Sequence, residues 1–462
     1  MQARVQSAEQ KSTPRSLTYL LMLTVFYIPN QRMFPDFSLT GLNITNILFV
    51  AILVLTLRNK KKDRTPAPLK KQFVFYCLVL TWGFLIGQIY DTSSFFSDFQ
   101  TLKNAVLYML LFFLAYHAVQ DTKTIKLLFL TILFTVFFDT YLGLRQVLDY
   151  GFGYNEARRV AAPFSWNSTD ANRSAAYYTI YLVPLAAAAL YYRSSSLVRW
   201  AALACVVFTI FVNFFTFSRQ SYGIIAVLLL LLTMRRNFVL GLLIVIALFN
   251  YHVWLPDAVI QRIDMTVKTK DSMPGVVAAP LNKELDTSTE SRFIIWSGAA
   301  QIIAHNPWGI GLNHFGRNIG IYAPAYAHYD AHNYFVLTTT ENGFLAPVAL
   351  LLLLLGLFRI GRSVEKLNGG ADAKVYGTAL WLGVLAVIMV NIYGSRFVDG
   401  NLMSNFWILA GLVARYHVIQ MRAIADSQIA TVQVYQSAPR QNGTQHRGPR
   451  ARRLQDGLPV QV

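Results

Sequence analysis

Long apolar runs separated by short polar segments recur along most of the chain. A run of about 20 apolar residues is long enough to cross the hydrocarbon core of a bilayer as a helix, and we count about twelve such spans. The pattern therefore predicts an all-α integral membrane protein. The expected spans lie at residues 17–31, 42–57, 73–90, 104–119, 125–145, 174–192, 199–217, 220–234, 238–255, 334–358, 375–393 and 402–415.

The basic residues of the short loops predict the orientation of these spans. Loop 58–72, "RNKKKDRTPAPLKKQ", is strongly basic, and loops rich in Lys and Arg stay in the cytoplasm. Alternation of the spans places "DTKTIK", "RSSSLVR", "RR" and "RIGRSVEK" on the same side as this loop. We therefore expect a transmembrane domain over 17–415, with the segment 1–16 and the tail 416–462 in the cytoplasm.

Composition supports a membrane protein and accounts for the charge. The chain is 54% hydrophobic and only 14% charged, which is too apolar for an ordinary soluble domain. The net charge of +18 comes largely from the basic loops and from the tail segment "APRQNGTQHRGPRARR". A disordered tail attracted to anionic lipid explains that segment better than nucleic-acid binding, so no nucleic-acid partner is expected.

The same alternation places one very long loop, 256–333, on the outer side between the ninth and tenth spans. Loops of this length usually carry function or are disordered. From Arg292 the stretch "RFIIWSGAAQIIAHNPWG" has helical periodicity and predicts a helix of about three turns on the membrane surface. Pro307 and Gly309 are expected to end it. The segment 266–288 has no periodicity, and we expect a mobile flap there.

Arginines collect on the predicted outer side, against the usual bias. Pairing with a nearby carboxylate explains most of them individually; Arg292, for example, is close in sequence to Glu290 and Asp286. Arg219, in "FTFSRQSYG", has a short loop that offers no carboxylate. A guanidinium at that position suits a phosphate or pyrophosphate at the membrane surface, which it can hold with two hydrogen bonds. The outer arginines are Arg158, Arg159, Arg173, Arg219, Arg262, Arg292 and Arg317.

Three stretches, in this order, resemble the O-antigen ligase and polymerase superfamily of bacterial envelope glycosyltransferases. They are "FTFSRQSYGIIAVLLLLL", "ESRFIIWSGAAQIIAHNPWGIGLNHF" and "DAHNYFVLTTTENGFLAPVALLLLLLGL". The resemblance is strongest over residues 160–360. One departure is Arg173 in "NSTDANRSAAYY", where the family more often has asparagine or a small residue, so the role of Arg173 stays open.

The resemblance implies a membrane glycosyltransferase of the multi-spanning C type in the bacterial inner membrane. Its donor would be a glycan on undecaprenyl pyrophosphate, and the acceptor hydroxyl would attack the anomeric carbon on the periplasmic side, with no metal or other cofactor. The acceptor would be lipid A-core in a ligase, which we favour. It would be another lipid-linked glycan in an O-antigen or exopolysaccharide polymerase, and a protein in an O-oligosaccharyltransferase.

Residues in the matching stretches suit this chemistry. Arg219, Arg292 and Arg173 are the candidates to bind the donor pyrophosphate. His332 is the candidate general base, since the pKa of an unperturbed imidazole lies near 6.5. His328, Asn333 and Glu341 are candidates for acceptor or supporting contacts. Glu341 either orients an arginine or is a satisfied helix carboxylate, and Asn333 is expected to cap a helix or bind.

Other functional classes have less support in the sequence. There is no P-loop, no dinucleotide glycine motif and no outer Asp-x-Asp motif, and Cys77 and Cys205 lie inside predicted spans, which argues against a disulfide framework or a zinc cluster. Asp139, within the apolar run at "FFDTY", would suit a lipid-linked glycan flippase or another transporter. Such proteins place ionisable residues near the midplane and contain internal repeats, whereas this chain concentrates its polar residues on the outer side.

Overall fold

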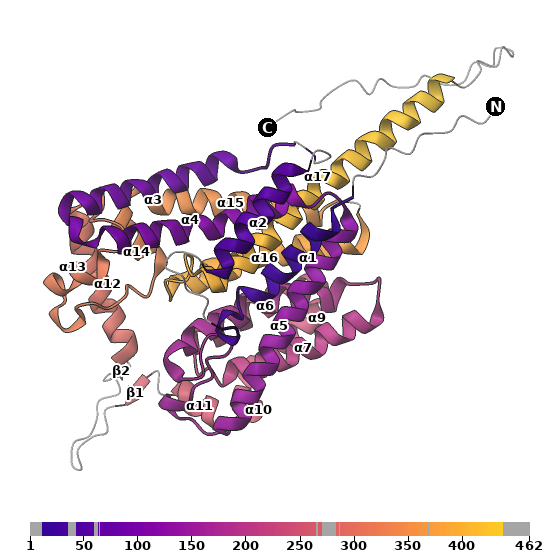
Figure 1. Ribbon diagram of the computed structural model, residues 1–462. Coiled ribbons are helices and arrows are strands. Elements are labelled where there is room, and N and C mark those ends of the chain that lie inside the picture. The colour runs from indigo at the N-terminus through magenta and orange to yellow at the C-terminus, as the bar shows by residue number, and fades with distance from the viewer. Residues whose placement is uncertain are drawn as a thin grey trace, which may run out of the picture. The chain divides into compact units, whose positions relative to one another are not determined.

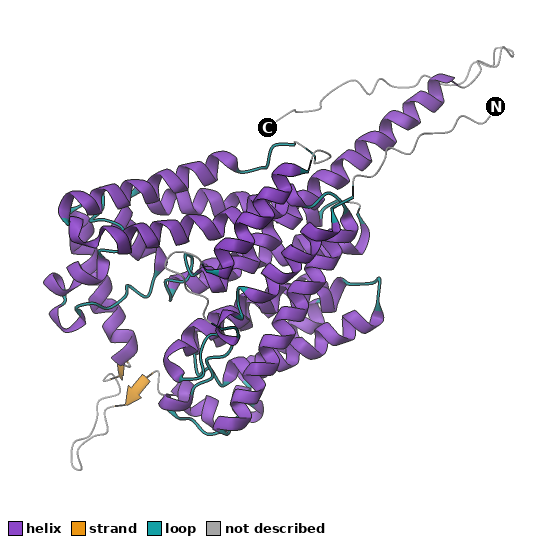
Figure 2. Ribbon diagram, in the orientation of Figure 1, coloured by secondary structure: helices purple, strands orange, loops and turns teal. Residues whose placement is uncertain are grey.

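The computed structural model describes residues 12–35, 43–59, 63, 65–264, 267–269, 283–285, 287–367 and 369–437. Helices make up almost all of this part of the chain (Figures 1 and 2). The helices are α1 (Arg15–Tyr27), α2 (Ile44–Arg58), α3 (Lys70–Tyr90), α4 (Phe95–Ala118), α5 (Thr122–Tyr150), α6 (Ala171–Tyr191), α7 (Ser196–Phe214), α8 (Arg219–Arg236), α9 (Phe238–Phe249), α10 (Tyr251–Trp254), α11 (Asp257–Asp264), α12 (Thr287–His305), α13 (Phe315–Tyr322), α14 (Tyr334–Asn342), α15 (Leu345–Glu365), α16 (Gly370–Ile392) and α17 (Gly400–Ser437).

The predicted all-α membrane fold is confirmed, although the number of spans is not established as twelve. Within the described residues, 8 helices are long and apolar enough to cross a membrane, and α2 and α9 are shorter apolar helices. The short strands β1 (Val267–Thr269) and β2 (Lys283–Leu285) pair antiparallel within the segment for which the sequence predicts a mobile flap. The rest of that segment up to residue 286 lies outside the described residues.

The core of the helical bundle lies around α6 and α16. The most apolar stretch of α6 is 89% buried and that of α16 is 78% buried, whereas those of α3 and α7 are only 33% buried. Helix α6 packs against both α7 and α16, and α16 also packs against α15. The apolar side chains on the outer surfaces of α3 and α7 are therefore available to lipid.

Two boundaries differ from those expected. The predicted span 334–358 is two helices, because Gly343 has a left-handed backbone with φ of 83° and separates α14 from α15. Helix α17 continues to Ser437 and so includes the first part of the predicted tail 416–462. Residues 438–462 of the predicted tail lie outside the described residues.

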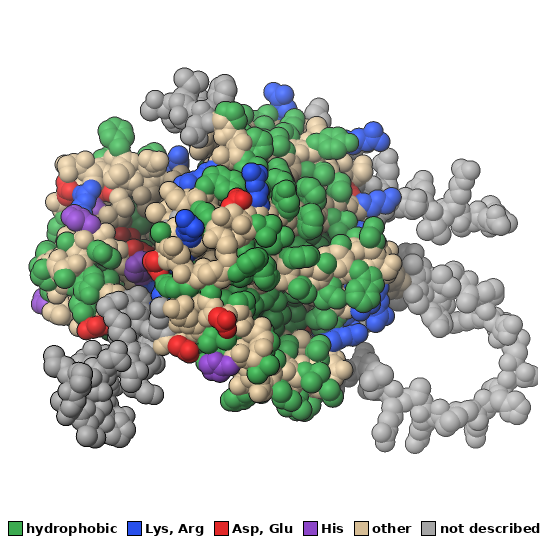
Figure 3. All heavy atoms as spheres, turned by 90° about the horizontal axis from the view of Figure 1, so that it is seen from below, with side chains coloured by type: hydrophobic (Ala, Val, Ile, Leu, Met, Phe, Trp, Pro, Cys, Tyr) green, Lys and Arg blue, Asp and Glu red, His purple; other side chains and the backbone are tan. Residues whose placement is uncertain are grey.

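Polar contacts join loops at the predicted cytoplasmic end to one another, and likewise loops at the predicted outer end. At the end predicted to be cytoplasmic, Arg415 donates to Asp63 and Gln120, each at 3.0 Å. At the other end, Arg317 pairs with Asp91 at 2.7 Å. Figure 3 shows a broad apolar region, with Lys and Arg gathered at the right-hand edge and His, Asp and Glu mainly to the left.

Cysteine accessibility tests which end faces outward. In a background without Cys77 and Cys205, Ala325→Cys should react with a membrane-impermeant thiol reagent in intact spheroplasts, because the charge bias places Ala325 on the outer side. Ser194→Cys should react only after the membrane is permeabilised. Both positions are exposed, so burial does not explain a difference. Labelling of Ser194→Cys in intact cells would reverse the assigned orientation.

Candidate active site

A backbone contact fixes the segment that follows α12 against the end of α14. The amide of Ile310 donates to the carbonyl of Thr340, and the amide of Gly311 donates to that of Glu341, each at 3.0 Å. The last carbonyls of a helix have no partners within the helix, and these two receive theirs from the "NPWGIG" segment. We call these contacts the α14 clamp. The clamp places the loop 313–333 beside α14.

Glu341 lies beneath this loop and is nearly fully buried. One carboxyl oxygen accepts a hydrogen bond from the amide of Phe315 at 3.2 Å. Burial raises the pKa of Glu341 to about 8, so the carboxyl is largely protonated at neutral pH. The Phe315 contact matches the alternative of a satisfied helix carboxylate rather than that of an arginine partner.

His332 lies in the loop before α14, where it is influenced by one carboxylate and two arginine cations. Its Nδ1 atom is 3.6 Å from a carboxylate oxygen of Asp330, and its side chain is 39% exposed. Burial lowers the pKa of His332 below its ordinary value; Asp330 opposes this shift, whereas the charges of Arg292 and Arg396 add to it. The imidazole is therefore neutral near pH 7 and able to accept a proton.

The backbone of this loop is held in an uncommon conformation. His328 and His332 both have positive φ, of 67° and 49°. Such values are rare outside glycine and often occur at functional sites. Trp296 of α12 donates to the carbonyl of Ala331 at 2.8 Å, and Asn333 caps α14 by accepting from the amides of Phe335 and Val336. This last contact is the helix cap expected from the sequence.

Helix α12 presents Arg292 and Trp296 to this loop from the same side, since they are four residues apart. The helix agrees with the sequence analysis in its buried face, because Ile295, Ala299 and Ile302 are all at most 1% exposed. It ends at His305, just before Pro307. It is longer than the three turns expected, since it begins at Thr287.

Arg219 is the first residue of α8 and lies near two other arginines. The charges of Arg159, Arg219 and Arg262 all act on the hydroxyl of Tyr222. Arg159 is 8% exposed and donates to the carbonyl of Thr216 at 2.8 Å. Glu156 pairs with Arg159 at 3.1 Å and with Arg262 at 3.7 Å, so three arginines and one carboxylate leave a net positive charge near the start of α8.

An apolar groove of about 600 Å³ begins at this positive cluster. It lies between α7, α8 and α9 and extends to α10 and α11. Arg219 and Tyr222 contribute to its lining, together with apolar side chains such as Phe214, Ile225 and Leu248. The groove thus combines an apolar wall with a guanidinium group.

Arg173 is held by a carboxylate. Its Nε and Nη2 atoms each donate to Asp399 at 2.6 Å, and its guanidinium lies 4.3 Å from the centre of the Phe164 ring. This bidentate pair uses the donors that a pyrophosphate would need. Donor binding by Arg173 therefore stays a prediction that requires the pair to open.

The contacts link these parts into one arc. Arg159 donates to Asn172 at 2.8 Å, next to Arg173. The Asp399 amide in turn donates to the carbonyl of Arg396 at 3.1 Å, and the charge of Arg396 acts on His332. The arc thus runs from the Arg219 cluster through the Arg173 pair to His332.

The sequence analysis did not single out two members of the His332 cluster. The sequence indicates a role for Asp330 only through its position two residues before His332. It indicates one for Arg396 only through its position in the outer loop 394–401. Asp330 is a neighbour of His332 in the sequence, whereas Arg396 is brought near it by the fold. Among the described residues, no group of three or more His, Cys, Asp or Glu side chains is placed to hold a metal ion.

Comparison with known families finds a match in the central part of the chain. Residues 204–351 match the model of a family described as O-Antigen ligase. This segment, about a third of the chain, is therefore similar to the O-antigen ligase and polymerase superfamily. The matching segment includes Arg219, Arg292, His332 and Glu341, whereas Arg173 and Arg396 lie outside it. None of the curated proteins matches the chain significantly.

The α14 clamp should be sensitive to a single methyl group. A Cβ on Gly309, which has φ of 99°, would lie 2.4 Å from the carbonyl oxygen of Glu341, so Gly309→Ala should lower stability by about 1–3 kcal/mol. Thermal unfolding in detergent should show a lower Tm. Gly223→Ala is the control, because nothing lies within 4 Å of its Cβ position. Equal Tm values for the two variants would contradict the clamp.

Proposed function

We propose that the chain is a periplasm-facing glycosyltransferase of the inner membrane, which moves a glycan from undecaprenyl pyrophosphate to a hydroxyl of lipid A-core. The observation that carries the proposal is the approach of the His332 imidazole to Asp330, at 3.6 Å, where the charges of Arg292 and Arg396 also act on it. A base and cations are the two groups that this transfer needs. The similarity of residues 204–351 to the O-antigen ligase family supports the reaction class.

In the proposed reaction the acceptor oxygen forms a bond to the anomeric carbon of the donor sugar. The bond from that carbon to the pyrophosphate oxygen breaks, and undecaprenyl pyrophosphate leaves as the anion. The proton of the acceptor hydroxyl passes to His332, while Asp330 stabilises the imidazolium that forms. Because pyrophosphate is a good leaving group, cationic side chains suffice to stabilise the negative charge that develops.

In this proposal the lipid-linked donor binds to the arginines and in the apolar groove. Arg219 and Arg292 bind the pyrophosphate, and the groove between α7, α8 and α9 takes the first part of the polyprenyl chain. Support comes from Arg219, which contributes to the lining of that groove. Arg159 and Arg262 add positive charge beside it. Arg173 would join only after release from Asp399.

The alternative functions differ in whether they would use His332 and the arginines. An O-antigen or exopolysaccharide polymerase would use the same base and arginines with a lipid-linked acceptor, and a protein O-oligosaccharyltransferase would use them with a protein acceptor. The flippase alternative rests on Asp139, which is fully buried and accepts a hydrogen bond from the hydroxyl of Tyr177. That contact suits a structural role in the packing of α5 against α6.

Loss of His332 should abolish transfer. In a strain that lacks the chain, wild-type protein should restore long O-antigen on lipid A-core, as seen on a gel of surface glycans. His332→Ala should leave bare core, because loss of a general base lowers the rate by about 10²–10⁴-fold.

The gel also separates the alternatives. His305→Ala, at an exposed position at the end of α12, is the matched control and should retain most activity at the same expression level. Core with a single repeat unit in the deletion strain would indicate a polymerase, and loss of secreted polymer alone would indicate an exopolysaccharide polymerase. Near-native O-antigen with His332→Ala would remove this residue as the base.

A separate prediction concerns Arg219. Arg219→Lys keeps the charge but loses the planar pair of donors. Loss of one hydrogen bond to a charged group costs about 1.5–3 kcal/mol, so kcat/KM for the lipid-linked donor should fall roughly tenfold or more. Arg236→Lys, at the opposite end of α8, is the control. Equal kcat/KM for both variants would contradict a specific pyrophosphate contact at Arg219.

A further inference from the structure

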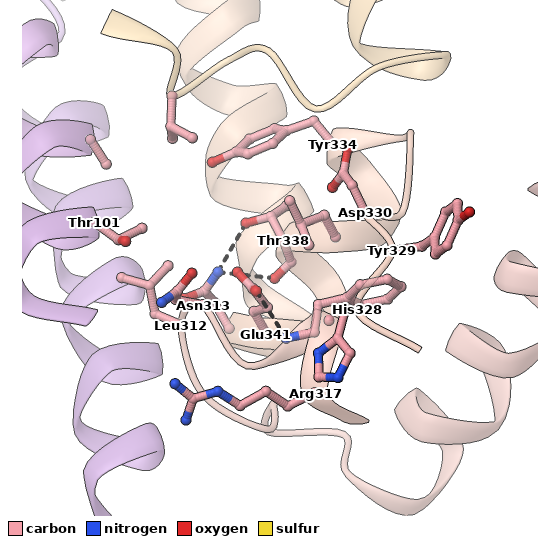
Figure 4. A pocket seen from close by; sticks show the side chains of 16 residues that line it. Thr101, Leu312, Asn313, Arg317, His328, Tyr329, Asp330, Tyr334, Thr338 and Glu341 are labelled. Atoms are coloured by element: carbon pink, nitrogen blue, oxygen red, sulfur yellow. Dashed lines mark hydrogen bonds between the residues drawn. The ribbon is translucent and has the colours of Figure 1, made fainter. Parts of the chain in front are cut away.

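A second cavity is lined by Asp330 but not by Arg292 or Arg396. It has a volume of about 350 Å³, which is within the range of small-ligand pockets. Figure 4 shows Thr101 on the α4 wall and Glu341 near the centre, with Asn313, His328 and Asp330 around it. The cavity is thus built from α4, α14 and the loop that the α14 clamp holds in place.

The lining is rich in groups that bind hydroxyls. Asn313, Tyr334, Thr338 and Glu341 offer amide, hydroxyl and carboxyl groups, which bind hydroxyls through hydrogen bonds. Tyr329 adds an aromatic ring. Several hydrogen-bonding groups beside flat apolar surface suit a sugar ring, which has hydroxyls on its edge and C–H groups on its faces.

The charges around the cavity disfavour an anion. Asp330 contributes a carboxylate to the lining, and Asp98 lies directly behind Asn313, which donates to it at 3.0 Å. The cationic lining residue Arg317 is already paired with Asp91 at 2.7 Å. A phosphate in the cavity would therefore meet carboxylates without a cation of its own.

Asp330 connects this cavity to the proposed base, because it both lines the cavity and approaches His332. We propose that the cavity binds the terminal sugar of the acceptor glycan, places one hydroxyl of that sugar toward His332, and selects uncharged or amino sugars over phosphorylated ones. This inference rests on the proposed function and adds the site and chemical class of the acceptor.

Direct binding tests the cavity without any transfer. The probes are methyl glycosides of glucose, galactose and N-acetylglucosamine and their 6-phosphates, detected by saturation-transfer NMR on the full chain in nanodiscs. At least one uncharged glycoside should bind at least tenfold more tightly than its phosphate. Equal or tighter binding of every phosphate, or no binding of any uncharged glycoside, would overturn the proposal.

Two variants locate that binding. Thr101→Trp should fill the cavity from α4 and abolish the signal, whereas Gln100→Trp, at an exposed neighbouring position, should not. Tyr329→Ala removes a side chain that is 51% exposed and should weaken binding without affecting folding. Unchanged binding in both Thr101→Trp and Tyr329→Ala would place the sugar elsewhere.

Transfer kinetics separate failure of this inference from failure of the proposed function. With lipid-linked donor at saturation, Thr101→Trp should raise the acceptor KM at least tenfold while the donor KM stays at the wild-type value. If the wild-type chain transfers glycan but this variant has an unchanged acceptor KM, the cavity assignment is wrong and the transferase stands. If the wild-type chain never transfers but binds the glycosides at this cavity, the proposed function is wrong and the sugar site stands.

Discussion

The contact between the "NPWGIG" segment and the end of α14 determines the geometry of the outer region. It gives hydrogen-bond partners to the carbonyls of Thr340 and Glu341, which would otherwise be left unpaired as α14 ends at Gly343. The same contact allows the loop amide of Phe315 to donate to Glu341. The site loop, the buried acid and the break before α15 therefore depend on one set of backbone hydrogen bonds.

Positive and negative side chains form separate groups near His332, and this separation suits a reaction with two substrates. Arginines from α8, α12 and the loop after α16 form the side assigned to the anionic donor, and carboxylates near α4 and α14 surround the cavity assigned to the acceptor. His332 is close to both signs of charge, with Asp330 on one side and Arg292 and Arg396 as its cationic neighbours. Burial and the arginines keep the imidazole neutral, while Asp330 remains available to stabilise its protonated form.

The features that follow from local pattern could be predicted from the sequence, and those that follow from long-range contacts could not. Apolar run length is sufficient to predict the membrane helices, and helical spacing is sufficient to predict the buried Ile295, Ala299 and Ile302 of α12. The pattern did not predict the break at Gly343, because the apolar run continues across it and the reason for the break is the distant "NPWGIG" segment. Arg173 looked available for a ligand because its partner Asp399 is 226 residues away. Arg396 likewise becomes a neighbour of His332 only through the fold.

The pH dependence of glycan transfer tests the central claim, that a neutral His332 is the base. With purified chain and saturating lipid-linked donor, the rate should fall on the acid side with a midpoint below the ordinary imidazole value of about 6.5, because the pKa of His332 is lowered. Arg396→Gln removes a cation that lowers this pKa, so the midpoint should move to higher pH. Asp330→Asn removes the acid that raises it, so the midpoint should move to lower pH. An acid limb that stays in the same place in both variants would show that another group accepts the proton.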